Sequence, residues 1–536
     1  MAALFELRAP PKKSIPKYFL IQFVKMSVVL SMLTSAAVSP TERQRALDRI
    51  HSDPGIPGDA TTSSFWLQTP HPEFSQKSSK PLPAVADVVI IGSGITGASI
   101  ARTLLQNRAK SSSTSSHPAV VMLEARDICS GATGRNGGHI LETAEEYAEI
   151  SDALGEESAR KLLRFRLAHL REMLNVAEEL GLTEATQARK VQFLSAYFGE
   201  EPWKAAVERL RRFKEGMPEE SAEWISYEGS SIPEEFKLSR ATGVVAGPAG
   251  ALWPYKFVTG VLSRLLSDYP EDFHIADHTA VEVINSSNGS DHPYKIETSR
   301  GTIFAKHVIH CTNAHVGHLV PGLRGRIFPV RGQMSAQTPG DKFPLQASKH
   351  SWLFNYDRGF DYLTQLPSGQ MMFGGGFASG EGGGVADLGI SKDNDMSVYL
   401  DIHLSGALSA VFGHESWGAV QGNPIQAMWT GNMAFSTDGF PWVGQLPSSV
   451  TGRSEPVGKN TGSEWVCAAF GGEGMVQAWL CGKALGTMIL KQDDQLVSTA
   501  DLDLNWFPEQ LLVSEKRISA AEMPRSVDET GRQSHL

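Results

Sequence analysis

Residues 86–105 of the chain read ADVVIIGSGITGASIARTLL, and this stretch decides the fold. Its apolar run has the length of one buried strand, and the residues after the glycines repeat with the period of a helix. Gly92 permits a tight turn, Gly94 lets the backbone approach a pyrophosphate, and Gly97 lets the helix pack closely on the strand. The sequence therefore predicts a strand, a glycine turn and a helix whose positive end faces phosphate groups.

A second apolar run, at residues 119–123, ends in Glu124. A carboxylate at the tip of the second strand accepts hydrogen bonds from an adenosine ribose and disfavours a ribose that carries a 2′-phosphate. The serine-rich residues 111–118 lengthen the gap between the two motifs and are expected to form a surface loop. A glycine turn alone also occurs in ordinary loops, but the acidic tip beside it indicates a Rossmann-like dinucleotide-binding unit.

The segment that follows this strand, residues 129–139, reads CSGATGRNGGH. Glycines and small polar side chains do not build a core, but they present many backbone N–H groups. A flexible loop is the alternative interpretation. The position directly after the ribose-binding strand favours a second cradle for the same large ligand.

The rest of the chain alternates between helical and strand patterns. Helical periodicity covers residues 144–181 and 203–214, which are expected to belong to an inserted second domain. Residues 465–469 form a predicted strand, and FGGEGM at residues 470–475 opens a helix. A glycine turn at a helix N-terminus makes a second site that stabilises negative charge.

Several short strands are predicted between these segments. Alternating runs at residues 280–284, 294–298 and 302–305 indicate a meander, and residues 306–311 indicate a separate buried strand. Residues 362–373 indicate a hairpin around a Pro-Ser-Gly turn.

Length and composition set the broad class of the protein. At 536 residues the chain is too long for one ordinary core, so two domains are expected. Hydrophobic residues make up 41% and charged residues 20%, as in globular proteins. The net charge of −10 argues against nucleic acid as a partner, because phosphate binding requires a basic surface.

The cysteines indicate neither a disulfide framework nor a metal site. They stand far apart, without a CxxC pair or a histidine at metal-ligand spacing. The four are Cys129, Cys311, Cys467 and Cys481. Reduced and mostly buried thiols are expected.

The N-terminal 40 residues allow more than one interpretation. Lysines within residues 12–17 precede two apolar stretches, residues 18–24 and 26–33, a pattern similar to a signal peptide or an anchor. Lys25 interrupts the stretches and neither spans a bilayer, so no stable membrane insertion is expected. A later start codon would leave an extension without structural meaning. Residues 39–83 are expected to form an arm wrapped on the surface.

Taken together, the motifs resemble those of the D-amino-acid oxidase superfamily of FAD-dependent oxidoreductases. The resemblance is nearest to its glycine oxidase, sarcosine oxidase and gamma-glutamylputrescine oxidoreductase branch, in the form common in fungi. It rests on the glycine turn at residues 92–97, GATGRNGG at 131–138, residues 329–333, STDGFP at 436–441 and the turn at 471–475. These motifs occur in family order over residues 85–490, and they carry no information about the substrate.

The resemblance implies an α/β fold in two domains. One is a discontinuous Rossmann-like FAD-binding domain of the glutathione-reductase type, and the other is a substrate domain built on an antiparallel sheet. The implied division is an N-terminal extension and arm at 1–83, FAD-binding segments at 84–150, 241–335 and 425–495, substrate-domain segments at 151–240 and 336–424, and a tail at 496–536.

The resemblance also implies which residues contact FAD. They are Gly92, Ser93, Gly94, Ile95, Thr96, Gly97, Glu124, Arg126, Thr133, Arg135, Asn136, Gly137, Val281, Asp438, Gly472, Gly474 and Met475. Some relatives bind the flavin covalently through a cysteine or a histidine. Gly431 and Arg135 stand at those positions here, so noncovalent FAD is expected. If the flavin is covalent after all, His139 and Cys129 are the residues expected to carry the bond.

The expected reaction is hydride transfer from a C–H bond beside an amine to flavin N5, followed by reoxidation by O2 to give hydrogen peroxide. The predicted substrate-facing residues are Gln333, Tyr362, His139 and Arg331. Trp253 and Tyr255 either face the substrate as well or are wall or core residues. Arg331 is either a clamp for a substrate carboxylate or a member of a structural ion pair. No side-chain base is required if the amine arrives neutral.

Two other functions stay open. One is FAD-dependent oxidation of an alcohol or a sugar-derived intermediate in fungal secondary metabolism, and the other is a flavoprotein that binds without turnover. NAD in place of FAD is disfavoured by the second cradle. The C-terminal Ser534, His535 and Leu536 are similar to a peroxisomal address, so a cytoplasmic or peroxisomal location is expected.

Overall fold

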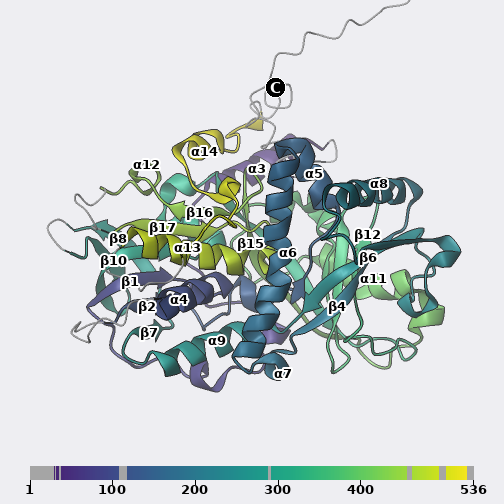
Figure 1. The fold of residues 1–536 in the computed structure, drawn as a ribbon, viewed down its shortest axis with the longest axis horizontal. Helices are drawn as coiled ribbons and strands as arrows, with labels where there is room; N and C mark the ends of the chain where they lie inside the picture. Colours follow the sequence, from purple (N-terminus) through teal and green to yellow (C-terminus); the bar gives the residue numbers. More distant parts are fainter. Residues whose placement is uncertain are drawn as a thin grey trace, which may run out of the picture.

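The computed structural model describes residues 29, 32–35, 38–107, 118–287, 291–454, 462–493 and 502–527. The serine-rich loop, most of the N-terminal basic and apolar segment and the C-terminal tripeptide lie outside these residues. Two β-sheets lie side by side in the described part of the chain, with helix α6 (Glu156–Glu179) running between the two halves (Figure 1).

The first sheet has eight strands and contains the glycine motif. Its main path runs β16-β17-β10-β1-β2-β7. In addition, β9 pairs with β10, and β8 pairs with β9. The strands are β1 Val85–Ile91, β2 Val120–Leu123, β7 Phe273–Ala276, β8 Val281–Ser286, β9 Tyr294–Thr298, β10 Gly301–His310, β16 Trp442–Gln445 and β17 Glu464–Ala468. β1 pairs in parallel with β2 and β10, as the buried apolar run predicted.

Helices cover this sheet as in a Rossmann-like unit. α4 (Ile95–Asn107) follows the glycine turn, and α13 (Ala478–Gln492) and α9 (Pro254–Asp268) pack beside it. The predicted meander is present, but the separate strand at residues 306–311 is wrong. No glycine or proline interrupts residues 302–310, so one strand, β10, runs through both predicted strands and pairs with β9 and β1.

The second sheet has nine strands in the order β15-β11-β14-β13-β12-β4-β6-β3, with β5 on β6. They are β3 His139–Ile140, β4 Arg189–Tyr197, β5 Ile225–Glu228, β6 Gly243–Ala251, β11 Ile327–Gln337, β12 His350–Asn355, β13 Phe360–Gln365, β14 Met371–Gly375 and β15 Ile425–Ser436. All its pairings are antiparallel except β12 with β4. The predicted α/β fold class is confirmed.

The chain passes between the sheets several times. β6, β11 and β15 lie inside segments predicted for the FAD-binding domain, yet they pair in the second sheet. The division of the chain into domain segments therefore stays a prediction, and these strands form the connection between the two halves.

Helices also line the second sheet. α11 (Val398–Trp417) covers one face, where Leu404 and Leu408 pack against Trp352 and Leu363. The predicted long helix at residues 144–181 is divided into α5 (Glu145–Leu154) and α6, because Gly155 between them has a φ of +86°. α8 (Glu200–Gly216) corresponds to the predicted helix at residues 203–214.

The N-terminal arm contributes a helix and one buried tryptophan to the fold. α3 (Pro40–His51) begins with a capping box between Ser39 and Glu42. Trp66, in the arm expected on the surface, is completely buried against Trp253. Apart from Ser64 and Trp66, residues 52–83 are exposed or half-buried, so this part of the arm lies on the surface and Trp66 fixes it to the core.

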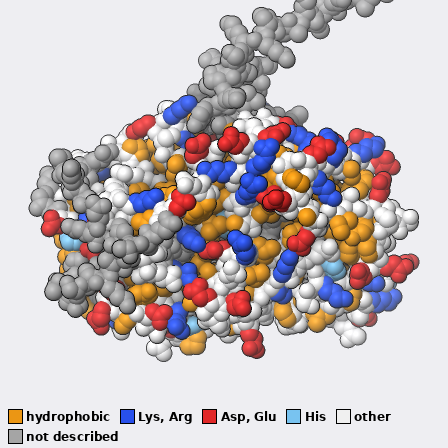
Figure 2. Space-filling view, viewed as in Figure 1, with side chains coloured by type: hydrophobic (Ala, Val, Ile, Leu, Met, Phe, Trp, Pro, Cys, Tyr) orange, Lys and Arg blue, Asp and Glu red, His pale blue; other side chains and the backbone are white. Residues whose placement is uncertain are grey.

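The surface carries charges of both signs. On the face shown in Figure 2, basic and acidic side chains are interspersed among small hydrophobic groups. Within the residues that the structure describes, no helix combines the length and apolarity needed to cross a bilayer.

Candidate active site and cofactor cradle

The glycine turn after β1 has the geometry that its spacing predicts. Gly92 has a φ of +112°, and a Cβ there would lie 2.7 Å from the carbonyl oxygen of Cys311. A Cβ on Gly97 would overlap the carbonyl oxygen of Gly92, so the helix approaches the strand only because this side chain is absent. The backbone N–H of Ile95 donates to Thr133 Oγ1 at 3.0 Å. The turn is thus fixed to the second glycine-rich segment.

Glu124 lies at the tip of β2, beside this turn. Its carboxylate accepts hydrogen bonds from the N–H of Ser93 at 3.1 Å, the hydroxyl of Ser93 at 2.7 Å and the N–H of Arg126 at 3.1 Å. The backbone of Glu124 is held between Ala276 and Thr279 of the neighbouring strand and its connection. These contacts fix the carboxylate beside the glycine turn, and its role as a ribose contact stays a prediction.

The second glycine-rich segment follows at residues 129–138. Its N-terminal end is fixed because the Cys129 N–H donates to Ser93 Oγ at 2.8 Å. A Cβ on Gly131 would meet no atom within 4 Å, and the buried hydroxyl of Ser130 has no hydrogen-bond partner in the described chain. Open space beside a buried hydroxyl without a partner is what a polar ligand would fill.

The closing turn, residues 470–475, reaches the same place from the other end of the chain. The Asn136 side chain donates to the sulfur of Met475 at 3.5 Å. A Cβ would meet no atom within 4 Å at Gly471, and none nearer than 3.8 Å at Gly474. The helix expected to open here begins only at Ala478, after the short η10 (Gly474–Val476). The two cradles are adjacent, and together with Glu124 they fit a large adenine-containing cofactor.

Two of the predicted FAD contacts, Arg126 and Arg135, are engaged by a buried carboxylate. Asp393 accepts from both terminal nitrogens of Arg126, at 3.0 and 3.1 Å, and lies 3.3 Å from Arg135 Nε. Arg135 also donates to the carbonyl oxygens of Thr62 and Thr430, at 3.0 and 2.8 Å. Burial lowers the pKa of Arg135 to about 10, although Asp393 acts in the opposite direction. These two guanidinium groups hold the cradle together.

Asp438 and Val281, two further predicted FAD contacts, are both buried. Asp438 is buried and accepts a bidentate pair of hydrogen bonds from Arg517, at 2.5 and 2.9 Å. Arg517 also lies over the ring of Trp442, so the C-terminal α14 (Glu515–Ala520) is fixed to the first sheet. Val281 begins β8, where it is buried and pairs with Thr298.

One face of the second sheet is directed at the cradles. The strand registers place Trp429, Met334, Gly374 and Tyr362 in one row across the sheet, on one face. Trp429 Nε1 donates to the Arg135 carbonyl at 2.9 Å. A Cβ on Gly137 would lie 2.7 Å from the ring of Tyr362. Burial, reinforced by Asp361, raises the pKa of the Tyr362 hydroxyl.

His139 lies on β3 at the end of the second cradle. Its Nε2 is 2.8 Å from Ser351 Oγ, in the row of the sheet next to Tyr362. Burial lowers the pKa of His139 to about 3, and the positive charge of Arg189 acts in the same direction. His139 is therefore a neutral hydrogen-bonding group at physiological pH.

Gln333 and Arg331, both predicted to face the substrate, lie on the other face of β11 from Met334. The Gln333 amide donates to Asp401 at 2.5 Å, and Arg331 Nε donates to Asp387 at 2.7 Å. These contacts do not support the predicted substrate-facing roles. For Arg331 they favour the structural ion pair.

Trp253 and Tyr255 line the side of the site that the arm covers. Trp253 Nε1 donates to the Trp66 carbonyl at 2.9 Å, and Trp66 Nε1 donates to the Asn136 carbonyl at 2.5 Å. The Tyr255 hydroxyl accepts from the His71 N–H at 3.1 Å. Both side chains are buried wall residues, as one of the two interpretations predicted.

Several residues that surround the site lie outside the sequence motifs and were not predicted. Asp393, Thr62 and Trp66 belong to segments without a motif, and Trp429 precedes the Thr-Gly pair on β15. For Trp66, the presence of a single large aromatic residue in a polar segment could have indicated that it is buried. Among the described residues, no group of three or more histidine, cysteine or acidic side chains has the arrangement of a metal site.

Comparison with known proteins decides the family. The family model for FAD dependent oxidoreductases (DAO) matches residues 87–488, which is most of the chain. The chain belongs to this family. It is therefore an FAD-dependent oxidoreductase, and its cradles fit that cofactor.

The similar proteins span the chain at low identity. A probable oxidoreductase OrdL from Rhizobium meliloti (strain 1021) is 23% identical over 451 residues, covering 83% of this chain and 92% of the relative. Gamma-glutamylputrescine oxidoreductase from Escherichia coli (strain K12) is 20% identical over 435 residues, covering 79% and 88%. Glycine oxidase from Geobacillus kaustophilus superposes with a TM-score of 0.57 at 17% identity, covering 81% of this chain and 99% of that chain. L-proline dehydrogenase from P. horikoshii gives 0.55 at 17% identity, covering 77% and 96%.

Proposed function

We propose that this FAD-dependent oxidoreductase oxidises the C–H bond beside an amine nitrogen in a small amine or amino acid. The main observation behind the proposal is which side chains line the face of the second sheet that is directed at the cradles. Tyr362 and the neutral His139 with its partner Ser351 lie there, whereas Arg331 on the other face is engaged by Asp387. An uncharged polar lining suits an amine that binds without its proton. Relatives named for amine-containing substrates, including gamma-glutamylputrescine, glycine and L-proline, support the same class.

In this proposal the side chains position the substrate rather than transfer its proton. FAD, when bound, supplies the acceptor for the hydride. Neutral His139 and the protonated hydroxyl of Tyr362 orient the substrate by hydrogen bonds. Trp66 and Trp253 exclude water on the arm side. No base is needed, because the substrate arrives as the free amine.

Noncovalent attachment of the flavin is part of the proposal. Cys129 is buried, and burial together with Glu124 raises the pKa of its thiol, so a nucleophilic thiolate is disfavoured. A Cβ on Gly431 would lie 3.0 Å from Arg135 Cβ, which leaves little room for a reactive side chain. Three further parts of the proposal are reoxidation by O2 to give hydrogen peroxide, membership of the glycine/sarcosine oxidase and gamma-glutamylputrescine oxidoreductase-like branch of fungal type, and a cytoplasmic or peroxisomal location.

The first test is the absorbance spectrum of the purified protein before and after acid precipitation. Flavin bands that move into the supernatant would support noncovalent FAD, and colour retained in the pellet would contradict it. A panel of amines, amino acids and alcohols is then mixed anaerobically with the protein, with bleaching of the flavin as the readout. Bleaching by an amine, with aldehyde or ammonia release and O2 consumption in air, is expected. Bleaching by alcohols alone would overturn the amine assignment, and no bleaching by any member would favour binding without turnover.

A further inference from the structure

Arg166 is a buried cation on α6 that three carboxylates surround. Its Nε donates to Glu142, and its Nη1 donates to Glu146 at 3.2 Å. Its Nη2 lies 3.0 Å from Glu473. The side chains of Arg166 and Glu142 are 5% and 3% exposed, so this cluster is part of the interior.

The three carboxylates come from both sides of the proposed cofactor site. Glu142 follows His139 by three residues, and Glu146 lies in the first turn of α5. Glu473 belongs to the closing turn and directly precedes Gly474 and Met475. One guanidinium group therefore joins the end of the second cradle to the closing turn.

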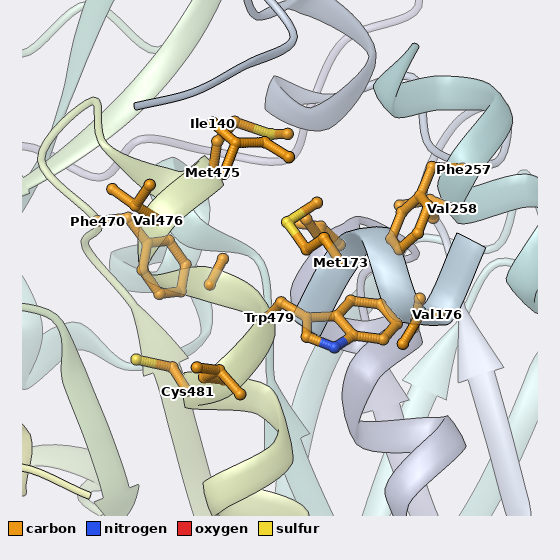
Figure 3. Close-up of a cluster of buried hydrophobic side chains, with 14 of the residues drawn as sticks. Ile140, Met173, Val176, Phe257, Val258, Phe470, Met475, Val476, Trp479 and Cys481 are labelled. Carbon is orange, nitrogen blue, oxygen red and sulfur yellow. The ribbon is translucent and has the colours of Figure 1, made fainter. Parts of the chain in front are cut away.

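A second contact from α6 strengthens this connection. One helical turn after Arg166, His169 Nε2 accepts a hydrogen bond from the backbone N–H of Leu480 at 3.2 Å, near the start of α13. Beside it, Met173 and Val176 of α6 pack toward Trp479, and Met475 lies close to Ile140 (Figure 3). α6 thus contacts the closing turn by one ion pair, and the following start of α13 by one hydrogen bond and an apolar seam.

The charges of the cluster make Arg166 necessary. One cation faces three carboxylates, and burial raises the pKa of Glu142 although Arg166 acts in the opposite direction. A buried carboxylate without a partner is strongly unfavourable. Glu473 also accepts a hydrogen bond from Gln477 Nε2 at 3.1 Å, which continues the connection into the turn. The position of the turn depends on the attraction between Arg166 and Glu473.

We propose that Arg166 and Glu473 are positioning residues for the flavin. Their ion pair holds the closing turn against the second cradle, so that the glycines of the turn keep FAD in place. The inference rests on the proposed function only in taking the closing turn as a flavin contact. Neither residue is assigned a chemical step.

The test uses Glu473→Gln in the holoenzyme. This change removes the charge that links Arg166 to the turn but leaves Glu142 and Glu146 on the arginine, and the Glu473 side chain is 31% exposed, so folding is preserved. Glu220→Gln is the matched control, because it breaks another pair of α6, Arg164 with Glu220 at 2.5 Å, away from the site. The readouts are the rate of FAD release after dilution, followed by flavin fluorescence, and the midpoint potential of the bound flavin.

The expected result is FAD release about tenfold faster in Glu473→Gln, as for loss of one charged hydrogen bond, and unchanged in Glu220→Gln. Arg166→Lys is the second variant, since it keeps the charge but loses the fork of donors, and it should give an intermediate rate. Wild-type release rates and potentials in both variants would overturn the inference. If the wild-type protein itself holds no FAD, the cofactor part of the proposed function has failed instead.

Discussion

The side-chain amide of Asn136 donates a hydrogen bond to the sulfur of Met475 at 3.5 Å, although 339 positions separate the two residues along the chain. The Asn136 oxygen accepts from the Gly138 N–H at 2.7 Å, so one side chain braces its own cradle and touches the other. Sequence motifs predicted both cradles separately. Their junction shows how distant glycine-rich segments form one site.

Replacing Asn136 with leucine should loosen FAD without unfolding the protein. The change removes three hydrogen bonds of the Asn136 side chain, those with Thr133, Met475 and Gly138, but keeps a similar volume. At roughly 0.5–1 kcal/mol for each bond, FAD release should be about ten- to a hundredfold faster. The measurement is flavin fluorescence after dilution of the holoenzyme. Asn285→Leu on the exposed part of β8 is the control and should release FAD at the wild-type rate. Equal rates in both variants would contradict the role of the junction.

Asp393→Asn should destabilise the fold, because it leaves Arg126 and Arg135 buried without an anion. Breaking one partner of a buried pair costs about 3–5 kcal/mol. Urea unfolding followed by tryptophan fluorescence measures the loss. Asp395→Asn, two positions away with a side chain 80% exposed, should change the free energy of unfolding by less than about 0.5 kcal/mol. A wild-type midpoint for Asp393→Asn would show that the arginines do not need this carboxylate.

A comparison of Asp393 with Glu124 explains which residues of the site can be predicted from the sequence. Glu124 was predictable because its role depends on a local motif, a strand tip next to a glycine turn. Asp393 lies in a segment without a pattern and meets Arg126 only through tertiary packing, 267 positions away. Arg331 and Gln333 show the same limit. The sequence marked residues 329–333 only as a motif. Their place on β11, and the face of β11 that meets the cradles, depend on register with β14 and β15.

Acid should weaken the fold through two buried neutral histidines. Burial lowers the pKa of His139 to about 3 and that of His169 to about 4, whereas an unfolded histidine titrates near 6.5. The stability from a depressed pKa is present above the unfolded value and is lost as pH falls from about 6.5 toward the folded value. At about pH 5 each should cost about 2 kcal/mol relative to neutral pH.

The measurement compares urea unfolding of the wild type and His169→Gln at about pH 7 and pH 5. The variant should lose about 2 kcal/mol less than the wild type between the two conditions. His403 is the control of opposite sign, because its hydrogen bond to Asp361 raises its pKa. His403→Gln should therefore lose more stability than the wild type on acidification. If the wild type and His169→Gln show the same pH dependence of stability, His169 takes up its proton as easily in the folded protein as in the unfolded chain, and the prediction is wrong.

Tyr362→Phe should impair substrate turnover while leaving FAD binding intact. The ring beside Gly137 remains, and only the hydroxyl, which lies near Gly374 of β14, is lost. A decrease of about tenfold in kcat/KM is expected for loss of one hydrogen bond in the transition state. Tyr399→Phe, at a position 55% exposed on α11, is the control. The rate of anaerobic flavin bleaching by the best amine substrate is the measurement, and an unchanged rate would remove Tyr362 from the site.

Trp66→Ala should cost both stability and cofactor retention, because Trp66 fixes the arm to the core. Trp66 is completely buried, its ring meets that of Trp253 at 5.1 Å, and its Nε1 donates to the Asn136 carbonyl. Truncation of a buried tryptophan costs about 3–5 kcal/mol, and the cavity would open beside the second cradle. Thermal unfolding with and without added FAD separates the two effects. Phe74→Ala, a half-buried change in the same arm, should cost less than half as much and leave FAD release unchanged. If Trp66→Ala keeps FAD as tightly as Phe74→Ala, the arm stabilises the fold but does not close the site.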